Sequence, residues 1–232
     1  MKRNLSLSLM SLLLIGLGMT MSSCAKGNSS DVNQDKIYTI YDVFYNKNSD
    51  KTWVTARFQF GGATGTNLQL DSTSYVMFNS DTLPYNWLFA CHFKEYAGRI
   101  TTGTFKYENQ NGQVFSNSVP TPDTLAFQPG FTTLHKNSAN TITWNGSALA
   151  PNEAVSLFVG TWVWGQDALG YQDGDGATNI ILGTNQMNNT ALGSATVYMD
   201  RKKQVNVTQG TSVGGTISAT FRATNTTVQV VN

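Results

Sequence analysis

Two tryptophans and a tyrosine form the pattern in this sequence that most favours ligand binding. Trp162 and Trp164 are two residues apart, and Tyr171 follows seven residues later. Alternate residues of a strand point to the same face, so a strand here would present both indoles as one flat apolar platform on which sugar rings can stack. Polar side chains that could hydrogen-bond to sugar hydroxyls lie close by in the sequence: Asp167, Asp173 and Asn179.

The alternative is that these tryptophans pack between two sheets, as a core tryptophan does in many β-sandwiches. Trp144 fits that core role, because it ends an alternating run, and this leaves Trp162 and Trp164 freer to bind. We therefore predict a candidate glycan platform of Trp162, Trp164 and Tyr171.

Residue patterns typical of catalysis are sparse. Cys91 and His92 are neighbours, and on a strand they would point to opposite faces, so they could not easily act as nucleophile and base. His135 is the one other histidine. The sequence contains no His-Glu-x-x-His and no phosphate-binding loop. We expect a protein that is not an enzyme, with no catalytic residue and no cofactor.

One acidic segment, Asp173-Gly174-Asp175-Gly176, looks like a fragment of a calcium-binding loop. Such a loop needs several oxygen ligands at fixed offsets. Here Ala177 occupies the next ligand position, and no glutamate closes the loop. A polar turn is the preferred interpretation, and no metal site is predicted.

The first 24 residues have the features of an export signal. Lys2 and Arg3 precede an apolar run over residues 5–19, and small residues follow before Cys24. The segment Met21-Ser22-Ser23-Cys24 resembles the lipobox of bacterial lipoproteins, although Met is less usual than Leu at its first position. The resemblance implies cleavage before Cys24 and lipidation of Cys24, which anchors the chain to a membrane. An ordinary signal peptide cut nearby is the alternative.

The charge composition argues against nucleic acid as a partner. Without Lys2 and Arg3, 13 basic residues face 14 acidic ones, so no basic field exists to attract nucleic acid. Charged residues make up only 12% of the chain, and its many Thr, Val, Tyr and Phe residues favour strands.

If Cys24 carries lipid, Cys91 has no disulfide partner and is most simply a small buried residue.

Residues 25–35 are small and polar, and they are expected to form a flexible tether after the lipidated cysteine. From residue 36 onward, short alternating runs are separated by turn residues. Expected strands cover residues 37–45, 53–60, 68–70, 75–78, 104–107, 114–119, 141–144, 154–159, 178–182, 195–199, 216–222 and 226–231. Residues 84–99 could form a short helical turn or an irregular crossover.

Pro120 and Pro122 interrupt this pattern, because proline lacks the donor that a strand needs. The predicted organisation is a signal peptide (1–23), a lipidated cysteine with tether (24–35) and two domains (36–122 and 123–232). Each domain is expected to be an antiparallel β-sandwich, so the fold class is all-β. One larger sandwich is the alternative.

Three segments of the second half are similar to a known type of module. Residues 141–144 (TITW), 152–155 (NEAV) and 215–221 (GTISATF) resemble the immunoglobulin-like modules of uncharacterised envelope lipoproteins from Bacteroidota-type bacteria. The resemblance implies two tandem immunoglobulin-like β-sandwiches and a location in the cell envelope. It brings no catalytic or binding residue with it.

Three tripeptides, at residues 71–73, 81–83 and 123–125, match the Asp-Ser/Thr-apolar pattern of O-glycosylation in the same bacterial group. If the resemblance holds, the candidate glycan carriers are Ser72, Thr82 and Thr124.

The expected function is binding, adhesion or structural support by an outer-membrane lipoprotein that faces either the cell surface or the periplasm. Its partners would be the membrane, through the lipid, and a glycan or an envelope protein. The alternative is a polysaccharide-binding lipoprotein that assists nutrient uptake.

Overall fold

The computed structural model describes residues 27–71 and 73–232. Strands dominate these residues, so the expectation of an all-β protein is confirmed. Within them the strands form three sheets, of 12, four and three strands. The 12-stranded sheet contains β1 (Gly27–Asn28), β2 (Ile37–Asn46), β3 (Lys51–Phe60), β4 (Thr66–Gln69), β7 (Tyr85–Asn86), β8 (Cys91–Ala97), β12 (Thr133–His135), β14 (Glu153–Gly160), β15 (Ala168–Gln172), β17 (Gly193–Asn206), β18 (Gly215–Arg222) and β19 (Thr226–Val231).

The two smaller sheets are built from the remaining strands. The four-stranded sheet contains β5 (Tyr75–Phe78), β6 (Asp81–Thr82), β9 (Thr104–Glu108) and β10 (Val114–Ser118). The three-stranded sheet contains β11 (Leu125–Phe127), β13 (Asn140–Gly146) and β16 (Asn179–Leu182), and a short helix, α2 (Thr184–Met187), follows it.

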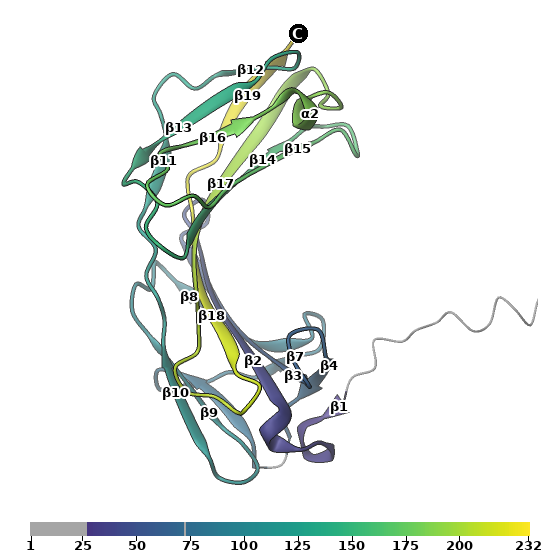
Figure 1. The fold of residues 1–232 in the computed structure, drawn as a ribbon, viewed down its shortest axis with the longest axis vertical. Helices are drawn as coiled ribbons and strands as arrows, with labels where there is room; N and C mark the ends of the chain where they lie inside the picture. The colour runs from purple at the N-terminus through teal and green to yellow at the C-terminus, as the bar shows by residue number, and fades with distance from the viewer. Residues whose placement is uncertain (1–26, 72) are drawn as a thin grey trace, which may run out of the picture.

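Each small sheet packs on a different part of the large one and closes a separate hydrophobic core. The first lobe, around β2 and β3, buries residues such as Tyr41, Phe58 and Phe105. The second lobe, around β14 and the first part of β17, buries Trp144 and Leu157 among others, which confirms the expected core position of Trp144. Figure 1 shows both small sheets on the same side of the large sheet.

The large sheet joins the two lobes through strands from the end of the chain. β17 is 14 residues long and pairs with β14 and β19 in the second lobe. Its last residues pair with β18, which lies parallel to β2 of the first lobe. Ile217 and Ala219 of β18 therefore belong to the first core.

This connection differs from the predicted organisation in two respects. A division at residues 122 and 123 does not separate the two cores, because β18 comes from the second half of the chain and packs in the first lobe. The sheets are also not wholly antiparallel, since β18 pairs with β2, β1 with β4 and β12 with β19 in parallel. The edge of β2 that does not pair with β3 has backbone N–H and C=O groups that need hydrogen-bonding partners. β18 supplies these partners.

Two local expectations were wrong. Residues 84–99 form the strands β7 and β8 with a tight turn between them, not a helical turn or a crossover. Residues 27–35 are folded rather than a free tether: β1 pairs with β4, and the side chains of Ser29 and Gln34 are buried. The hydroxyls of Ser29 and Ser30 donate hydrogen bonds to the Asp71 carboxylate, which ties this segment to the first lobe.

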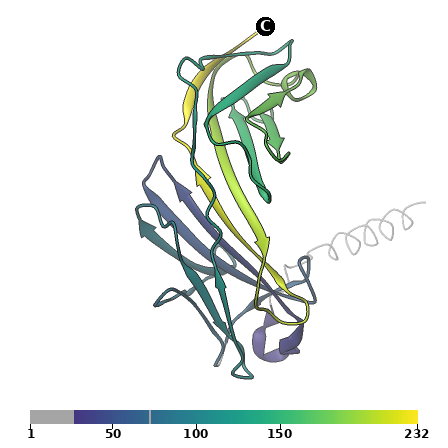
Figure 2. The ribbon, with the colours of Figure 1, turned by 60° about the vertical axis from the view of Figure 1, so that its left-hand side comes forward.

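The molecule is elongated and curved. In Figures 1 and 2 the large sheet bends along its length, and the small sheets lie on its convex side. Among residues 27–71 and 73–232, no sheet covers the opposite side of the large sheet, and we call that side the concave face. Because side chains alternate along a strand, the concave face receives the residues between the buried ones, such as Asp42 between Tyr41 and Val43 of β2, and Phe44 after Val43.

Candidate functional site: an aromatic row on the concave face

Aromatic side chains form a row across the strands of the concave face. Phe158 of β14 lies opposite Tyr198 of β17, with ring centroids 6.0 Å apart. Phe44 of β2 lies opposite Trp53 of β3, and their rings stack at 5.7 Å. Phe158 and Trp53 are 40% and 41% exposed, which is enough to offer ring surface to a ligand. We call these four residues, together with Arg222, the aromatic row.

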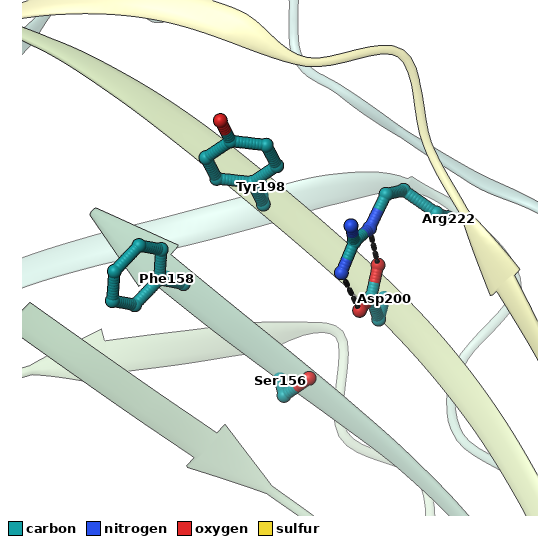
Figure 3. Close-up of a pocket in the computed structure, with 5 residues that line it drawn as sticks. All are labelled: Ser156, Phe158, Tyr198, Asp200 and Arg222. Atoms are coloured by element: carbon teal, nitrogen blue, oxygen red, sulfur yellow. Dashed lines mark hydrogen bonds and ion pairs between the residues drawn. The ribbon is translucent and has the colours of Figure 1, made fainter. Parts of the chain in front are cut away.

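Arg222 joins the two aromatic pairs into one surface. Its guanidinium carbon lies 4.9 Å from the centroid of Phe44 and 5.4 Å from that of Tyr198. The Nε and Nη2 atoms each donate a 2.7 Å hydrogen bond to the carboxylate of Asp200 on the neighbouring strand. Figure 3 shows this pair beside Phe158 and Tyr198. The hydrogen bonds to Asp200 raise the pKa of Arg222 and keep its guanidinium close to the rings of Phe44 and Tyr198.

Two shallow grooves lie along this row. One, of about 290 Å³, is lined by Ser156, Phe158, Tyr198, Asp200 and Arg222. The other, of about 440 Å³, has Arg222, Phe44 and Trp53 on its walls. Its remaining lining residues are Asp42, Thr55, Arg57, Phe89, Cys91 and Phe93. Arg222 borders both grooves, so they form neighbouring parts of one surface.

Polar groups contact or accompany the rings of the second groove. The Trp53 indole N–H donates a 2.8 Å hydrogen bond to Glu95, which also binds Lys51, and this holds the indole in one orientation. Burial raises the pKa of the Asp42 carboxyl, and the hydrogen bond from Ser218 only partly offsets that effect. The positive charges of Lys202 and Arg57 act in the same direction as Ser218.

The site extends across several strands. The order β14-β17-β18-β2-β3-β8 is continuous in the large sheet. With neighbouring strands separated by about 4.8 Å, the surface from Phe158 to Phe93 is about 24 Å long. A surface of this length, with alternating rings and charged groups, can contact several units of a linear polymer.

The predicted platform lies elsewhere. Trp162 and Trp164 are 88% and 100% exposed, but they lie in the loop between β14 and β15 rather than on a strand. The argument that they share a strand face therefore does not hold. Tyr171 is on β15, opposite Ser156 of β14, and is 64% exposed, so it extends the concave face beyond Phe158. The structure thus connects Tyr171 with the aromatic row through β14.

The aromatic row was not predicted from the sequence, although the alternation of its residues with buried ones is visible there. Trp53, Thr55 and Arg57 alternate with buried residues along β3, and Tyr198 and Asp200 do so along β17. What the sequence did not show was the pairing of β18 with β2, which places Arg222 beside Phe44.

The other residues singled out in the sequence are placed as follows. Cys91 is buried, as expected, and burial raises the pKa of its thiol. The ring of His92 is also buried, and its Nδ1 lies 2.8 Å from the Leu83 carbonyl oxygen. Cys91 lines the groove on the concave face, whereas His92 contacts Phe58 of the first core. The two side chains therefore point to opposite faces, as predicted.

The candidate modification sites are dispersed. Thr82 ends β6 and Thr124 precedes β11, and both are exposed. Ser72 and Cys24 lie outside the described residues. In residues 27–71 and 73–232, no three His, Cys, Asp or Glu side chains gather closely enough to hold a metal ion. No helix among these residues has the length and apolar character needed to span a membrane.

A comparison with known protein families found no family whose model matches the chain, and a comparison with curated proteins found no similar sequence.

Proposed function

We propose that this chain is a non-enzymatic, lipid-anchored protein of the bacterial envelope that binds a polysaccharide on its concave face. The aromatic row is the observation that carries the proposal. Pyranose rings present flat C–H faces that pack on aromatic rings, and their hydroxyl groups can hydrogen-bond to charged side chains such as Asp200 and Arg222.

The length of the surface favours a polymer over a single sugar. Small ligands are usually enclosed by their sites, whereas both grooves of the concave face are shallow and adjoin each other at Arg222. An extended glycan chain can lie across the strands and touch Phe158 and Trp53 together. The absence of large single-sign charge on the chain supports a neutral polymer or one of low charge.

The cellular setting is part of the same proposal. The lipobox-like segment ending at Cys24 supports export, cleavage and anchoring at the outer membrane, facing the cell surface or the periplasm. The two cores, each between the large sheet and a small sheet, support the description of two immunoglobulin-like sandwiches, here joined through β17 and β18. Binding could serve adhesion or polysaccharide capture for nutrient uptake.

The test is binding of the Cys24→Ser protein, without its signal peptide, to a panel of polysaccharides by affinity electrophoresis and calorimetry. We expect at least one polymer to bind, and Trp53→Ala and Phe158→Ala each to weaken its binding about tenfold, which corresponds to about 1.4 kcal/mol. The double variant Trp162→Ala/Trp164→Ala is the matched control and should bind normally.

Two results would contradict the proposal. Failure of every polymer to bind would leave the aromatic row as a surface for an envelope protein. Loss of binding only in the Trp162→Ala/Trp164→Ala variant would move the site to the loop between β14 and β15.

A further inference from the structure

An exposed apolar turn connects β7 with β8 in the first lobe. Its residues Trp87, Leu88 and Phe89 are 82%, 68% and 50% exposed. Asn86 orders the turn, because its side-chain oxygen accepts hydrogen bonds from the backbone N–H groups of Leu88 and Phe89 at 3.0 and 3.2 Å. Single exposed apolar side chains are common on protein surfaces, whereas several that lie next to one another mark an interaction site. We call residues 87–89 the apolar turn.

Strand register places the apolar turn beside the first strand of the described chain. β8 and β4 pair with the same edge of β3, β8 with residues 51–56 and β4 with residues 58–60. The start of β8, at Cys91, therefore lies next to the end of β4. β7 pairs with the other edge of β8, and β1 pairs with the other edge of β4, so β7 and β1 are also close to each other. Figure 1 shows β1, β4 and β7 together at the same side of the first lobe.

The apolar turn leaves the plane of the sheet on the concave side. Phe89 contacts Phe93 edge-on, with ring centroids 5.3 Å apart, and lines the groove that holds Trp53. Trp87 and Leu88, which are more exposed than Phe89, are not part of that groove lining. The glycan surface thus accounts for Phe89 and leaves two large apolar side chains without a role.

A lipid on Cys24 would bring a bilayer close to the apolar turn. β1 begins at Gly27, three residues after Cys24. Three residues span at most about 11 Å even when fully extended. Because residues 27–36 are tied to the first lobe through Asp71 and β4, no long tether separates the lobe from a bilayer that holds the Cys24 lipid.

We propose that Trp87 and Leu88 of the apolar turn insert into the membrane interface beside the lipid anchor, and this rests on the lipidation of Cys24 in the proposed function. Tryptophan is enriched at the headgroup level of membranes, where its ring is apolar and its N–H remains hydrated. A second contact beside the lipid orients the first lobe on the bilayer. The Trp162-Val163-Trp164 loop does not share this position, because it follows Gly160, which pairs near the start of β17 in the second lobe.

The experiment uses the full-length lipidated protein in vesicles of phosphatidylethanolamine and phosphatidylglycerol that contain lipids brominated near the top of the acyl chains. Bromine quenches a tryptophan that it contacts. We expect quenching in the wild-type protein and in Trp162→Phe/Trp164→Phe, and its loss in Trp87→Phe. In Leu88→Asp, which places a charge on the turn, quenching should fall while the thermal unfolding temperature stays unchanged.

Intact-mass measurement of the same sample separates the two proposals. If Cys24 carries lipid and Trp87→Phe is quenched as strongly as the wild-type protein, the membrane contact is wrong and the anchor stands. If Cys24 carries no lipid, the anchor fails and the membrane contact fails with it. Polysaccharide binding is measured without vesicles and is independent of both results.

Discussion

Arg222 and Asp200 face each other on β18 and β17 and form a two-pronged ion pair, with both N–O distances at 2.7 Å. The pair lies where the strands of the first lobe meet those of the second. It holds the guanidinium between Phe44 and Tyr198 and so makes the concave face continuous. The strand pairing that joins the two lobes therefore also positions the residues of the proposed site.

Arg222→Lys should weaken polysaccharide binding about tenfold, because lysine keeps the charge but loses the planar fork that packs between two rings. Its effect on stability should be no more than about 1 kcal/mol, since the pair is partly exposed. Calorimetry of binding and urea unfolding measure the two quantities.

Arg99→Lys is the matched control, because Arg99 also lies over an aromatic ring, at 4.9 Å from Phe221, whose side chain packs in the second core on the opposite side of β18. It should bind normally. Equal losses in both variants would show that the effect is general to arginine and not specific to the aromatic row.

Protonation of Asp42 should increase the free energy of unfolding when the pH is lowered mildly. Burial raises its pKa in the folded state above the ordinary value of 3.8, so the folded state binds the proton more readily than the unfolded chain. This contribution to stability increases as the pH falls through the folded pKa and is complete below 3.8. Asp42→Asn should remove this increase and leave the rest of the pH profile unchanged.

Urea unfolding of both proteins at several pH values between 3 and 7 checks this prediction. The difference between the two profiles isolates Asp42 from carboxyls such as Asp35 and Asp81, whose pKa values are lowered and whose effect has the opposite sign. Parallel profiles for the wild-type and Asp42→Asn proteins would show that Asp42 titrates normally.

The second lobe depends on a buried ion pair. Arg201 is fully buried and donates hydrogen bonds to Glu153 and to the carbonyl oxygens of Ser147 and Ala148. Arg201→Met leaves the Glu153 carboxylate buried without its partner, and we expect a loss of about 3–5 kcal/mol in the free energy of unfolding. Urea denaturation measures the loss.

The double variant Glu153→Leu/Arg201→Met should recover most of that stability, because the unpaired charge is then removed. A cost below about 1 kcal/mol for Arg201→Met alone would mean that water reaches the carboxylate, contrary to its burial.

Local patterns predicted many of the elements. The alternation of residues 37–45 and 53–60 predicted a hairpin that the structure contains as β2 and β3, and Asn111-Gly112 correctly predicted the turn between β9 and β10. These elements depend on neighbours in sequence. The tether was missed because the pairing of Gly27 with Leu68 depends on residues far along the chain.

The site was harder to predict than the elements. Each strand of the concave face shows its alternation locally, but the row exists only because β18 lies beside β2, about 175 residues away in sequence. No local pattern specifies such a pairing. The exposed Trp162 and Trp164 were identified, yet their loop conformation was not, because Thr161 and Asp167 fold the segment through side-chain hydrogen bonds.

Because β18 completes the first lobe, residues 27–122 should not fold alone. Such a fragment lacks Ile217 and Ala219 of the first core and leaves the outer edge of β2 without a partner. An unpaired edge of this length promotes aggregation. We expect poor solubility and collapsed amide dispersion in its NMR spectrum.

Joining residues 200–222 to this fragment through a flexible linker returns β18 and its hairpin partner, and it should restore a dispersed spectrum. If residues 27–122 alone gave a dispersed spectrum and a cooperative unfolding transition, the first lobe would be an independent domain and β18 an accessory to it. The full-length protein would then show two unfolding transitions, whereas shared strands predict one, because losing β18 disrupts both cores together.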